Sequence, residues 1–153
     1  MRILMLQGPG QASTQLDGEV AANLWRTAWR AGHALHFQAN ADIAALASSI
    51  RATAASQCGF ILLDAGSWPS SSRESREDIR RALDELAAPV VEVCARSDHA
   101  LEFPERASCR LVATIIIGTD ALSRFRVALG IALRRLSLAP PGARAQAGAS
   151  ARG

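Results

Sequence analysis

The stretch Pro89-Val-Val-Glu-Val-Cys-Ala-Arg-Ser-Asp-His-Ala-Leu-Glu-Phe103 joins a short apolar run to a polar segment. Its first part, from Val90 to Cys94, is rich in β-branched residues and follows a proline, which predicts a buried strand. Asp98 and His99 follow the strand end closely in sequence, just after Cys94. This combination predicts a strand that ends in a functional loop.

Similar apolar runs lie on both sides of this stretch and alternate with helical patterns. The runs are bounded by turn residues, as expected for strands buried in a parallel sheet. Strands that alternate with amphipathic helices imply right-handed crossovers. We therefore predict a flavodoxin-like three-layer α/β/α sandwich with a five-stranded parallel sheet in the order 2-1-3-4-5. The predicted strands are residues 2–6, 34–37, 59–63, 90–94 and 111–117, and the predicted helices are residues 19–31, 42–55, 72–86 and 120–136.

The length of 153 residues fits one domain with a sizeable core. The composition changes near the end, where Ala139-Pro140-Pro141-Gly142 leads into a segment of mostly small residues. We predict a domain over residues 1–137 and a flexible Pro/Gly/Ala-rich tail over residues 138–153.

Composition and charge argue against several classes of protein. No apolar run approaches the ~20 residues that cross a bilayer, and the apolar start meets Gly8-Pro9 too early for a signal peptide, so we expect a cytoplasmic protein with no membrane partner. The net charge is +3 without a basic stripe, which argues against nucleic acid binding. The three cysteines form no Cys-x-x-Cys pair, so we expect no disulfide framework and no metal site. No motif indicates a cofactor.

In sheets of this order, ligands bind beyond the carboxyl ends of the strands, next to the switch point between the first and third strands. The loops that follow Leu6, Leu63, Cys94 and Ile117 therefore form the candidate site. The first of these loops carries Gly8-Pro9-Gly10, which suits either an anion-binding turn or an ordinary tight turn, and tight turns are the more frequent.

The stretch from Pro89 to Phe103 resembles the active-site loop of type II 3-dehydroquinate dehydratases, or type II dehydroquinases, which reads Pro-Val-Val-Glu-Val-His-(Leu/Ile)-Ser-Asn-x-His-Ala-Arg-Glu-x-Phe. Gln7-Gly8-Pro9-Gly10 is similar to the family's Asn-Gly-Pro-Asn, and Phe37-Gln38-Ala39-Asn40 is similar to its Phe-x-Gln-Ser-Asn. The resemblance extends over most of residues 1–136 in chain order. It implies the same fold, a small carboxylate ligand and a homo-oligomer, either a trimer or a dodecamer.

The resemblance also implies roles for individual residues. Glu92 matches a glutamate of the family motif, and Cys94 takes the position of the catalytic histidine. Ala95 and Arg96 stand where two backbone N–H groups bind the substrate carboxylate in the family. The implied catalytic residues are Glu92 and Cys94, and the implied substrate-binding residues are Gln7, Asp64, Gly66, Ser70, Ala95, Arg96 and Arg106.

The family's reaction converts 3-dehydroquinate to 3-dehydroshikimate in the shikimate pathway and needs a tyrosinate base and a histidine acid. This chain has no tyrosine, the segment after its first strand lacks the arginine of the family's lid, and Cys94 replaces the histidine. Each well-placed acid or base contributes about 10²–10⁴-fold in rate. We therefore predict a dehydroquinase-like protein that is catalytically impaired or inactive.

Several alternatives stay open at this point. One is an active dehydratase with a displaced active site, and another is a retooled enzyme in which His99 activates Cys94 as a nucleophile. Asp64 follows a buried strand, as the phosphorylated aspartate of a receiver domain does, but the chain has neither lysine nor an acidic pair after the first strand. A flavin-binding module would need a richer Ser/Thr loop than Ser13-Thr14.

Overall fold

The computed structural model describes residues 1–10, 16–54, 56, 58–66, 73–96, 100–101, 111–117 and 120–138. In this part of the chain, strands and helices alternate along most of the sequence, as the apolar periodicity predicts. The strands are β1 (Arg2–Gln7), β2 (Ala34–Ala39), β3 (Phe60–Asp64), β4 (Val90–Cys94) and β5 (Leu111–Ile116), and the helices are α1 (Gly18–Arg30), α2 (Ile43–Ala54), α3 (Arg73–Asp84) and α4 (Ala121–Leu138).

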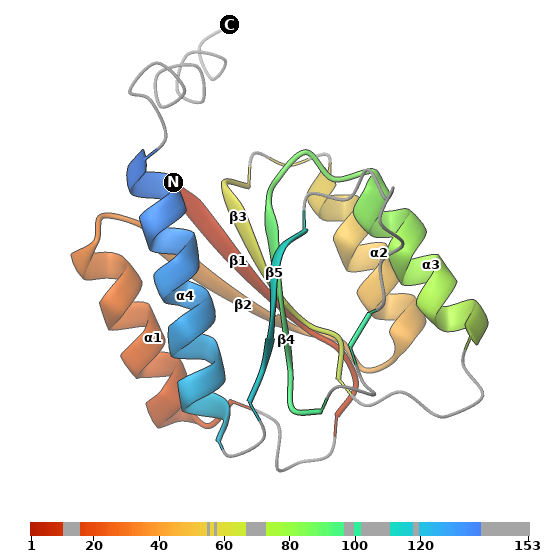
Figure 1. Ribbon diagram of the computed structural model, residues 1–153, viewed down its shortest axis with the longest axis horizontal. Helices are drawn as coiled ribbons and strands as arrows, with labels where there is room; N and C mark the ends of the chain where they lie inside the picture. Colours follow the sequence, from red (N-terminus) through yellow and green to blue (C-terminus); the bar gives the residue numbers. More distant parts are fainter. Residues whose placement is uncertain are drawn as a thin grey trace, which may run out of the picture.

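The strands pair in parallel in one five-stranded sheet with the order β2-β1-β3-β4-β5, which confirms the predicted topology. Helices α1 and α4 cover one face of the sheet, and α2 and α3 cover the other (Figure 1). This is the three-layer sandwich of flavodoxin-like folds. Parallel pairing brings the carboxyl ends of all the strands to one edge of the sheet, which we call the carboxyl edge.

The sheet separates two apolar cores, because successive side chains of a strand point to opposite faces. Leu62 and Val93 belong to the core under α1 and α4, whereas Leu63 belongs to the core under α2 and α3. Every residue of the central strands β3 and β4 is buried, since helices cover both faces. The acidic residues of these two strands, Asp64 and Glu92, are therefore buried and need hydrogen-bond partners inside the fold.

Capping residues mark the ends of two helices. Asp120 precedes α4 and accepts a hydrogen bond from the backbone N–H of Ser123 at 2.6 Å. Gly32 lies just after α1 with a φ of 78°, and its N–H donates to the carbonyl oxygen of Trp29 at 2.9 Å. Glycine adopts this left-handed conformation without the steric cost of a Cβ atom, so α1 ends here.

Three strands extend further toward the carboxyl edge than the sequence predicts. β1 reaches Gln7 and β3 reaches Asp64, and these two residues pair across the ladder. β2 continues to Ala39. Polar and small residues have weak strand propensity, but parallel pairing with a neighbour continues through them. Helix α4 likewise continues to Leu138, past its predicted end, and the rest of the predicted tail lies outside the described residues.

Helix α1 shows both of its tryptophans to solvent. Trp25 and Trp29 are 45% and 65% exposed, and their rings stack with centroids 5.5 Å apart and planes 10° from parallel. The inward face of the helix consists of Leu24 and Ala28. The helix thus contacts the core through aliphatic side chains and carries its aromatic pair on the outside.

The alternating charges of α3 form an exposed ionic face. Glu77 lies 3.6 Å from Arg80 and 3.7 Å from Arg81, and Asp78 pairs with Arg51 of α2. These contacts lie at the surface, where ion pairs contribute little to stability. No helix in the described part of the chain is both long and apolar enough to span a membrane.

Candidate functional site at the carboxyl edge

A hollow of about 210 Å³ opens at the carboxyl edge, between the ends of β1, β2 and β3. This position adjoins the switch point of the sheet, where ligands bind in folds of this kind. The described lining combines the backbone of the loop after β1 with a few polar side chains. Its residues are Gln7, Gly8, Pro9, Gly10, Ala39, Asn40, Ala41, Asp64 and Gly66.

Two glycines bring the loops after β1 and β3 into direct contact. A Cβ atom on Gly8 would lie 2.3 Å from the carbonyl oxygen of Ala65, and one on Gly66 would lie 2.0 Å from that of Pro9. Gly66 also has a φ of +79°, which glycine adopts readily. The Gly8 N–H donates to the carbonyl oxygen of Asp64 at 2.7 Å. One wall of the hollow is therefore backbone held in a fixed position.

Asp64 brings a carboxylate to the hollow at the end of β3. Its Oδ1 accepts a hydrogen bond from the N–H of Gly66 at 3.0 Å, which holds the side chain over the turn. Gln7 lies beside it in the neighbouring strand and also lines the hollow. A carboxylate and an amide can together accept and donate hydrogen bonds to ligand hydroxyl groups.

Asn40 closes the hollow on the side of β2. Its Nδ2 donates to the carbonyl oxygen of Gln7 at 3.0 Å, and its Oδ1 accepts from the hydroxyl of Ser49 at 2.6 Å. The side-chain amide of Gln38 donates to the same hydroxyl at 2.7 Å. Because both ends of its amide are engaged, Asn40 fixes the end of β2 against β1.

Glu92 lies inside the sheet and is only 1% exposed. Its Oε1 accepts from the N–H of Leu101 at 2.6 Å, and its Oε2 accepts from the hydroxyl of Thr114 at 3.0 Å. Burial raises the pKa of the Glu92 carboxyl, the two hydrogen bonds oppose this rise, and the charge of Asp64 adds to it. Since the protein occupies both oxygens, Glu92 connects β4, β5 and the segment at Leu101.

Cys94 ends β4 and is 5% exposed. Its thiol points to the carbonyl oxygen of Ile115, with a distance of 3.7 Å from Sγ. Burial, followed by the charges of Glu92 and Asp64, raises the pKa of Cys94 to about 12 against the opposing charge of Arg124. At neutral pH the thiol is protonated, holds its proton tightly and is a weak nucleophile.

Arg124 extends from α4 toward the same edge and is 5% exposed. Its Nη1 donates to the carbonyl oxygen of Ile117 at 2.9 Å. The N–H of Ile117 in turn donates to the carbonyl oxygen of Cys94 at 3.2 Å. These contacts place the guanidinium at the carboxyl end of β5, close to the end of β4.

The structure brings part of the predicted substrate-binding set together. Gln7, Asp64 and Gly66 line the hollow. Ala95 and Arg96 follow β4 at the same edge, but they are not among its described lining residues. Other residues that the sequence analysis singled out lie outside the described residues, namely Ser70, Arg106, Asp98 and His99.

Two polar residues at this edge, Arg124 and Thr114, were missed from sequence, and only the first of them carries a signal. Arg124 shares the helical spacing of the buried residues Phe125 and Ala128, so a charged residue on an inward face could have been noticed. Thr114 opposes Glu92 only through the β4–β5 register, which shifts between Val90 and Val91. The role of Asn40 depends likewise on contacts between strand ends.

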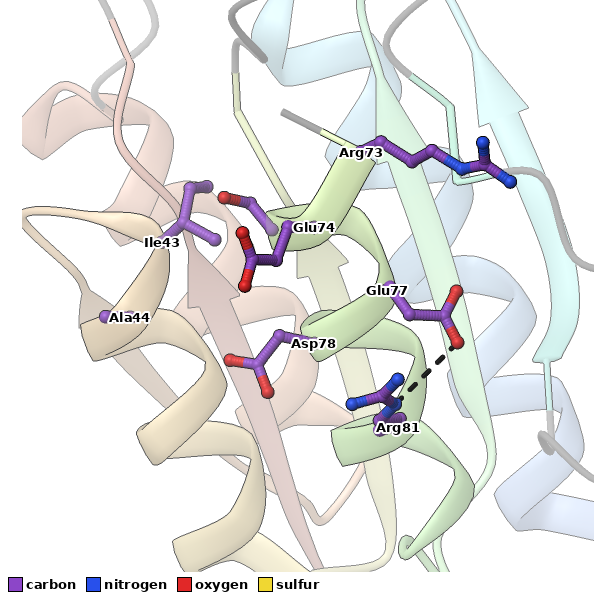
Figure 2. A pocket seen from close by; sticks show the side chains of 8 residues that line it. Ile43, Ala44, Arg73, Glu74, Glu77, Asp78 and Arg81 are labelled. Carbon is purple, nitrogen blue, oxygen red and sulfur yellow. Dashed lines mark ion pairs between the residues drawn. The ribbon is translucent and has the colours of Figure 1, made fainter. Parts of the chain in front are cut away.

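A larger groove of about 960 Å³ lies between α2 and α3, lined by charged side chains (Figure 2). Glu74 and Asp78 point toward α2, whereas Glu77 points away from it and pairs with Arg81. Asp78 is held by Arg51. Charges of both signs lie here on an open helical surface, which does not enclose a ligand. We therefore assign the candidate site to the smaller hollow, which is lined by buried polar groups and by backbone.

The carboxylates of the described residues are spread over the surface and the sheet. No group of three or more His, Cys, Asp or Glu side chains that could hold a metal ion occurs in the part of the chain that the structure describes. Asp64 and Glu92 lie on neighbouring strands, but each is held by hydrogen bonds from the protein.

Three bacterial proteins are among the solved structures that share this architecture. A type II dehydroquinase from Propionibacterium acnes has a TM-score of 0.66 and 20% identity, covering 87% of this chain and 98% of that one. A type II dehydroquinase from Butyrivibrio crossotus has a TM-score of 0.64 and 14% identity, covering 86% and 97%. This chain has a type II dehydroquinase-like fold. A 3-dehydroquinate dehydratase-like protein from Bifidobacterium longum is also similar, with a TM-score of 0.62 and 16% identity, covering 90% and 98%.

The dehydroquinase-like fold confirms, at the level of architecture, the resemblance found in residues 89–103. No family model matches the chain, and no curated protein matches it in sequence. Identities of 14–20% show a shared fold, whereas activity has to be argued from the residues at the site.

Proposed function

We propose that this dehydroquinase-like protein binds a small hydroxylated carboxylate at its carboxyl edge and does not dehydrate it. The ligand would be a cyclic acid of the size of 3-dehydroquinate, quinate or shikimate. The fold supports the choice of ligand class, and the chemistry of the residues at the edge supports the loss of turnover.

The observation that carries the proposal is the state of Cys94. The resemblance gives this position to the family's general acid, a histidine, whose ordinary pKa near 6.5 suits proton transfer at neutral pH. The Cys94 thiol is buried, points to Ile115 and has a pKa of about 12. A group with such a high pKa is a poor proton donor to a departing hydroxyl, and on the order of one thiol in 10⁵ is ionised at neutral pH.

The other half of the reaction lacks a suitable group as well. Dehydration begins with removal of a proton next to a ketone, and the family uses a tyrosinate for this step. The chain contains no tyrosine at all. Glu92 is the buried carboxylate nearest in sequence to Cys94, but both of its oxygens accept hydrogen bonds from the protein. We therefore expect neither step to proceed at a useful rate.

The hollow nevertheless offers what a polyhydroxylated ring requires. Asp64 and Gln7 supply acceptor and donor atoms beside a rigid backbone wall. Because Asp64 carries a negative charge, a ligand would turn its hydroxyl groups toward it and its own carboxylate away, toward the ends of β4 and β5. Ala95 and Arg96, the proposed carboxylate-binding positions, follow β4 in that direction.

Two measurements on the purified full chain test the proposal. The first follows absorbance of the 3-dehydroshikimate enone after addition of 3-dehydroquinate, with a competent type II dehydroquinase as the positive control. The second measures binding of quinate and shikimate by calorimetry, with cyclohexanecarboxylate as a control ligand that lacks hydroxyl groups. We expect no turnover, and tighter binding of the hydroxylated acids than of cyclohexanecarboxylate.

A pair of variants connects the binding to the hollow. Ala41→Trp fills the hollow from its rim and should abolish binding, whereas Ala22→Trp adds the same side chain to the exposed face of α1 and should leave binding intact. Turnover at the rate of the positive control would show an active dehydratase instead. Equal binding of cyclohexanecarboxylate and shikimate would refute recognition of the hydroxyl groups.

Assembly is a separate part of the proposal and rests on the resemblance. We expect a homo-oligomer, a trimer or a dodecamer, which light scattering coupled to size-exclusion chromatography distinguishes from a monomer of 16.2 kDa. If the protein is a monomer at all concentrations tested, the expectation of a homo-oligomer is wrong, and the binding proposal is unchanged.

A further inference from the structure

We propose that Arg124 forms a charged pair with the carboxylate of the ligand at the carboxyl end of β5, in addition to the proposed contacts of that carboxylate with Ala95 and Arg96. The identity of the ligand rests on the proposed function, whereas the anion site itself rests on Arg124 and its surroundings. No role for this residue follows from the resemblance to dehydroquinases described above.

Among the residues that the structure describes, Arg124 is a buried charge without an anionic partner. It is 5% exposed, and its Nε is buried with no hydrogen-bond partner in this part of the chain. Within the described residues, no carboxylate lies at ion-pair distance from its guanidinium. Taking an unpaired charge out of water is unfavourable. An anion that binds from outside the protein would pair with this charge and offset the cost of its burial.

The nearest acid in sequence is already engaged elsewhere. Asp120 precedes α4, where its carboxylate accepts from the backbone N–H of Ser123 at 2.6 Å and from the Ser123 hydroxyl at 2.8 Å. These hydrogen bonds cap the helix and lower the pKa of Asp120, which also feels the charge of Arg124 more weakly. Asp120 thus serves the helix end and does not form an ion pair with Arg124.

A purely structural role accounts for only part of Arg124. The Nη1 hydrogen bond to the carbonyl oxygen of Ile117 fixes the start of α4 against the end of β5. A neutral amide such as glutamine could make the same contact. The charge and the unpartnered Nε are left without a function unless an anion binds there.

The position of Arg124 fits the orientation that the hollow imposes on a ligand. Ile117 joins the guanidinium to the end of β4 through its hydrogen bond to Cys94. Strands lie about 4.8 Å apart, so the ends of β3 and β5 are roughly 10 Å apart across β4. A six-membered ring acid with its hydrogen bonds spans a distance of this order, with hydroxyl groups near Asp64 and the carboxylate near Arg124.

The surrounding charges favour a carboxylate over a phosphate. Glu92, Asp64 and Arg124 all influence the pKa of Cys94, so these groups share one electrostatic environment. A dianion would be repelled by the two carboxylates about twice as strongly as a monoanion. The planar fork of arginine also matches the two oxygens of a carboxylate.

The test compares an acid with its neutral ester on the full-length protein. We expect the wild type to bind shikimate on the order of tenfold to a hundredfold more tightly than methyl shikimate, because the ester cannot form the charged hydrogen bonds. Arg124→Met should remove this preference. Arg126→Met is the matched control, since Arg126 is exposed on the same helix and should keep the wild-type ratio.

A second variant, Arg124→Gln, controls for misfolding of Arg124→Met. Arg124→Gln keeps a donor for Ile117 and should also lose the preference for the acid over the ester. Equal affinity of the wild type for acid and ester overturns the proposal without any variant, as does an unchanged ratio in Arg124→Gln. In both cases binding of shikimate would leave the proposed function intact.

Acetate separates the anion site from the proposed ligand. We expect acetate to raise the melting temperature of the wild type and of Arg126→Met in a saturable way, and not that of Arg124→Gln. If acetate acts in this way but shikimate does not bind, the anion site stands and the proposed function fails. An acetate effect of equal size in all three proteins overturns the role of Arg124.

Discussion

The carboxylate of Glu92 accepts a hydrogen bond from the backbone N–H of Leu101 at 2.6 Å, across the interior of the carboxyl edge. The second carboxylate oxygen accepts from Thr114 on the neighbouring strand. A single buried side chain therefore connects β4 with β5 and with the segment at Leu101. Sequence similarity suggested a glutamate of an active-site motif, and the geometry gives it a structural role in holding that motif.

Replacing Glu92 with glutamine should remove a pH dependence of stability. The pKa of Glu92 is raised in the folded protein relative to its ordinary value of 4.5, so the folded state binds this proton more tightly than the unfolded state. The stability that this provides is complete below about pH 4.5 and is lost as the pH rises through the raised pKa. We expect Glu92→Gln to gain stability relative to wild type over that interval, as measured by urea unfolding at several pH values.

Glu92→Leu is the control for the hydrogen bonds themselves. Glutamine can still accept from Leu101 and donate to Thr114, whereas leucine leaves both groups unsatisfied, at a cost of about 1–3 kcal/mol. We expect Glu92→Leu to be less stable than Glu92→Gln at every pH. A constant difference in unfolding free energy between wild type and Glu92→Gln would show that the carboxylate does not titrate with a raised pKa.

Cys94 should resist alkylation in the native protein. With Cys58 and Cys109 replaced by serine, iodoacetamide can label only Cys94, and mass spectrometry gives its rate. The pKa of about 12 leaves little thiolate at neutral pH, so we expect labelling at least about 100-fold slower than for the same variant in urea. Native labelling as fast as that of the unfolded chain would favour the nucleophile hypothesis.

Gly66→Ala should destabilise the protein and perturb the hollow. The substitution forces alanine into a φ of +79° and brings its Cβ against the carbonyl oxygen of Pro9. We expect a loss of about 2 kcal/mol or more in unfolding free energy, since the left-handed conformation alone costs a residue with a Cβ about 1–2 kcal/mol. Gly18→Ala is the control, because a Cβ there meets nothing within 4 Å. A neutral Gly66→Ala would contradict the contact between the two loops.

The ion pair between Arg51 and Asp78 should contribute little, although it joins α2 to α3. Both side chains remain about 40% exposed, and exposed ion pairs typically contribute 1 kcal/mol or less. We expect Arg51→Ala to lower the free energy of unfolding by about 0.5 kcal/mol, and less at high salt. A loss of several kcal/mol would show that the two helices depend on this pair.

The fold could be predicted from sequence because its strands and helices carry strong and different periodicities. The apolar runs at residues 60–63 and 90–94, the second interrupted only by Glu92, are buried on both faces, as expected of parallel strands of this length. The strand ends were less predictable. Gln7 and Asp64 extend β1 and β3 because they pair with each other, and Gln7 also pairs with Ala39 of β2.

Residues of the candidate site could be predicted only where the strand order by itself brings them together. Gln7 and Asp64 end neighbouring strands and Gly66 follows the second of them, and all of these residues line one hollow. Arg124 and Thr114 depend on tertiary distances and on a register shift, which local sequence does not encode. The state of Cys94 depends in the same way on burial and on the charges of Glu92 and Asp64.

The stacked indoles of Trp25 and Trp29 give the molecule an optical reporter of its outer layer. Two aromatic chromophores 5.5 Å apart and nearly parallel couple electronically, so their circular dichroism depends on the intact last turns of α1. This signal is lost when the helix frays, even while the buried strands still give the far-ultraviolet circular dichroism of a β-sheet. Recording both signals during unfolding would reveal whether the helical layer and the sheet come apart in one step.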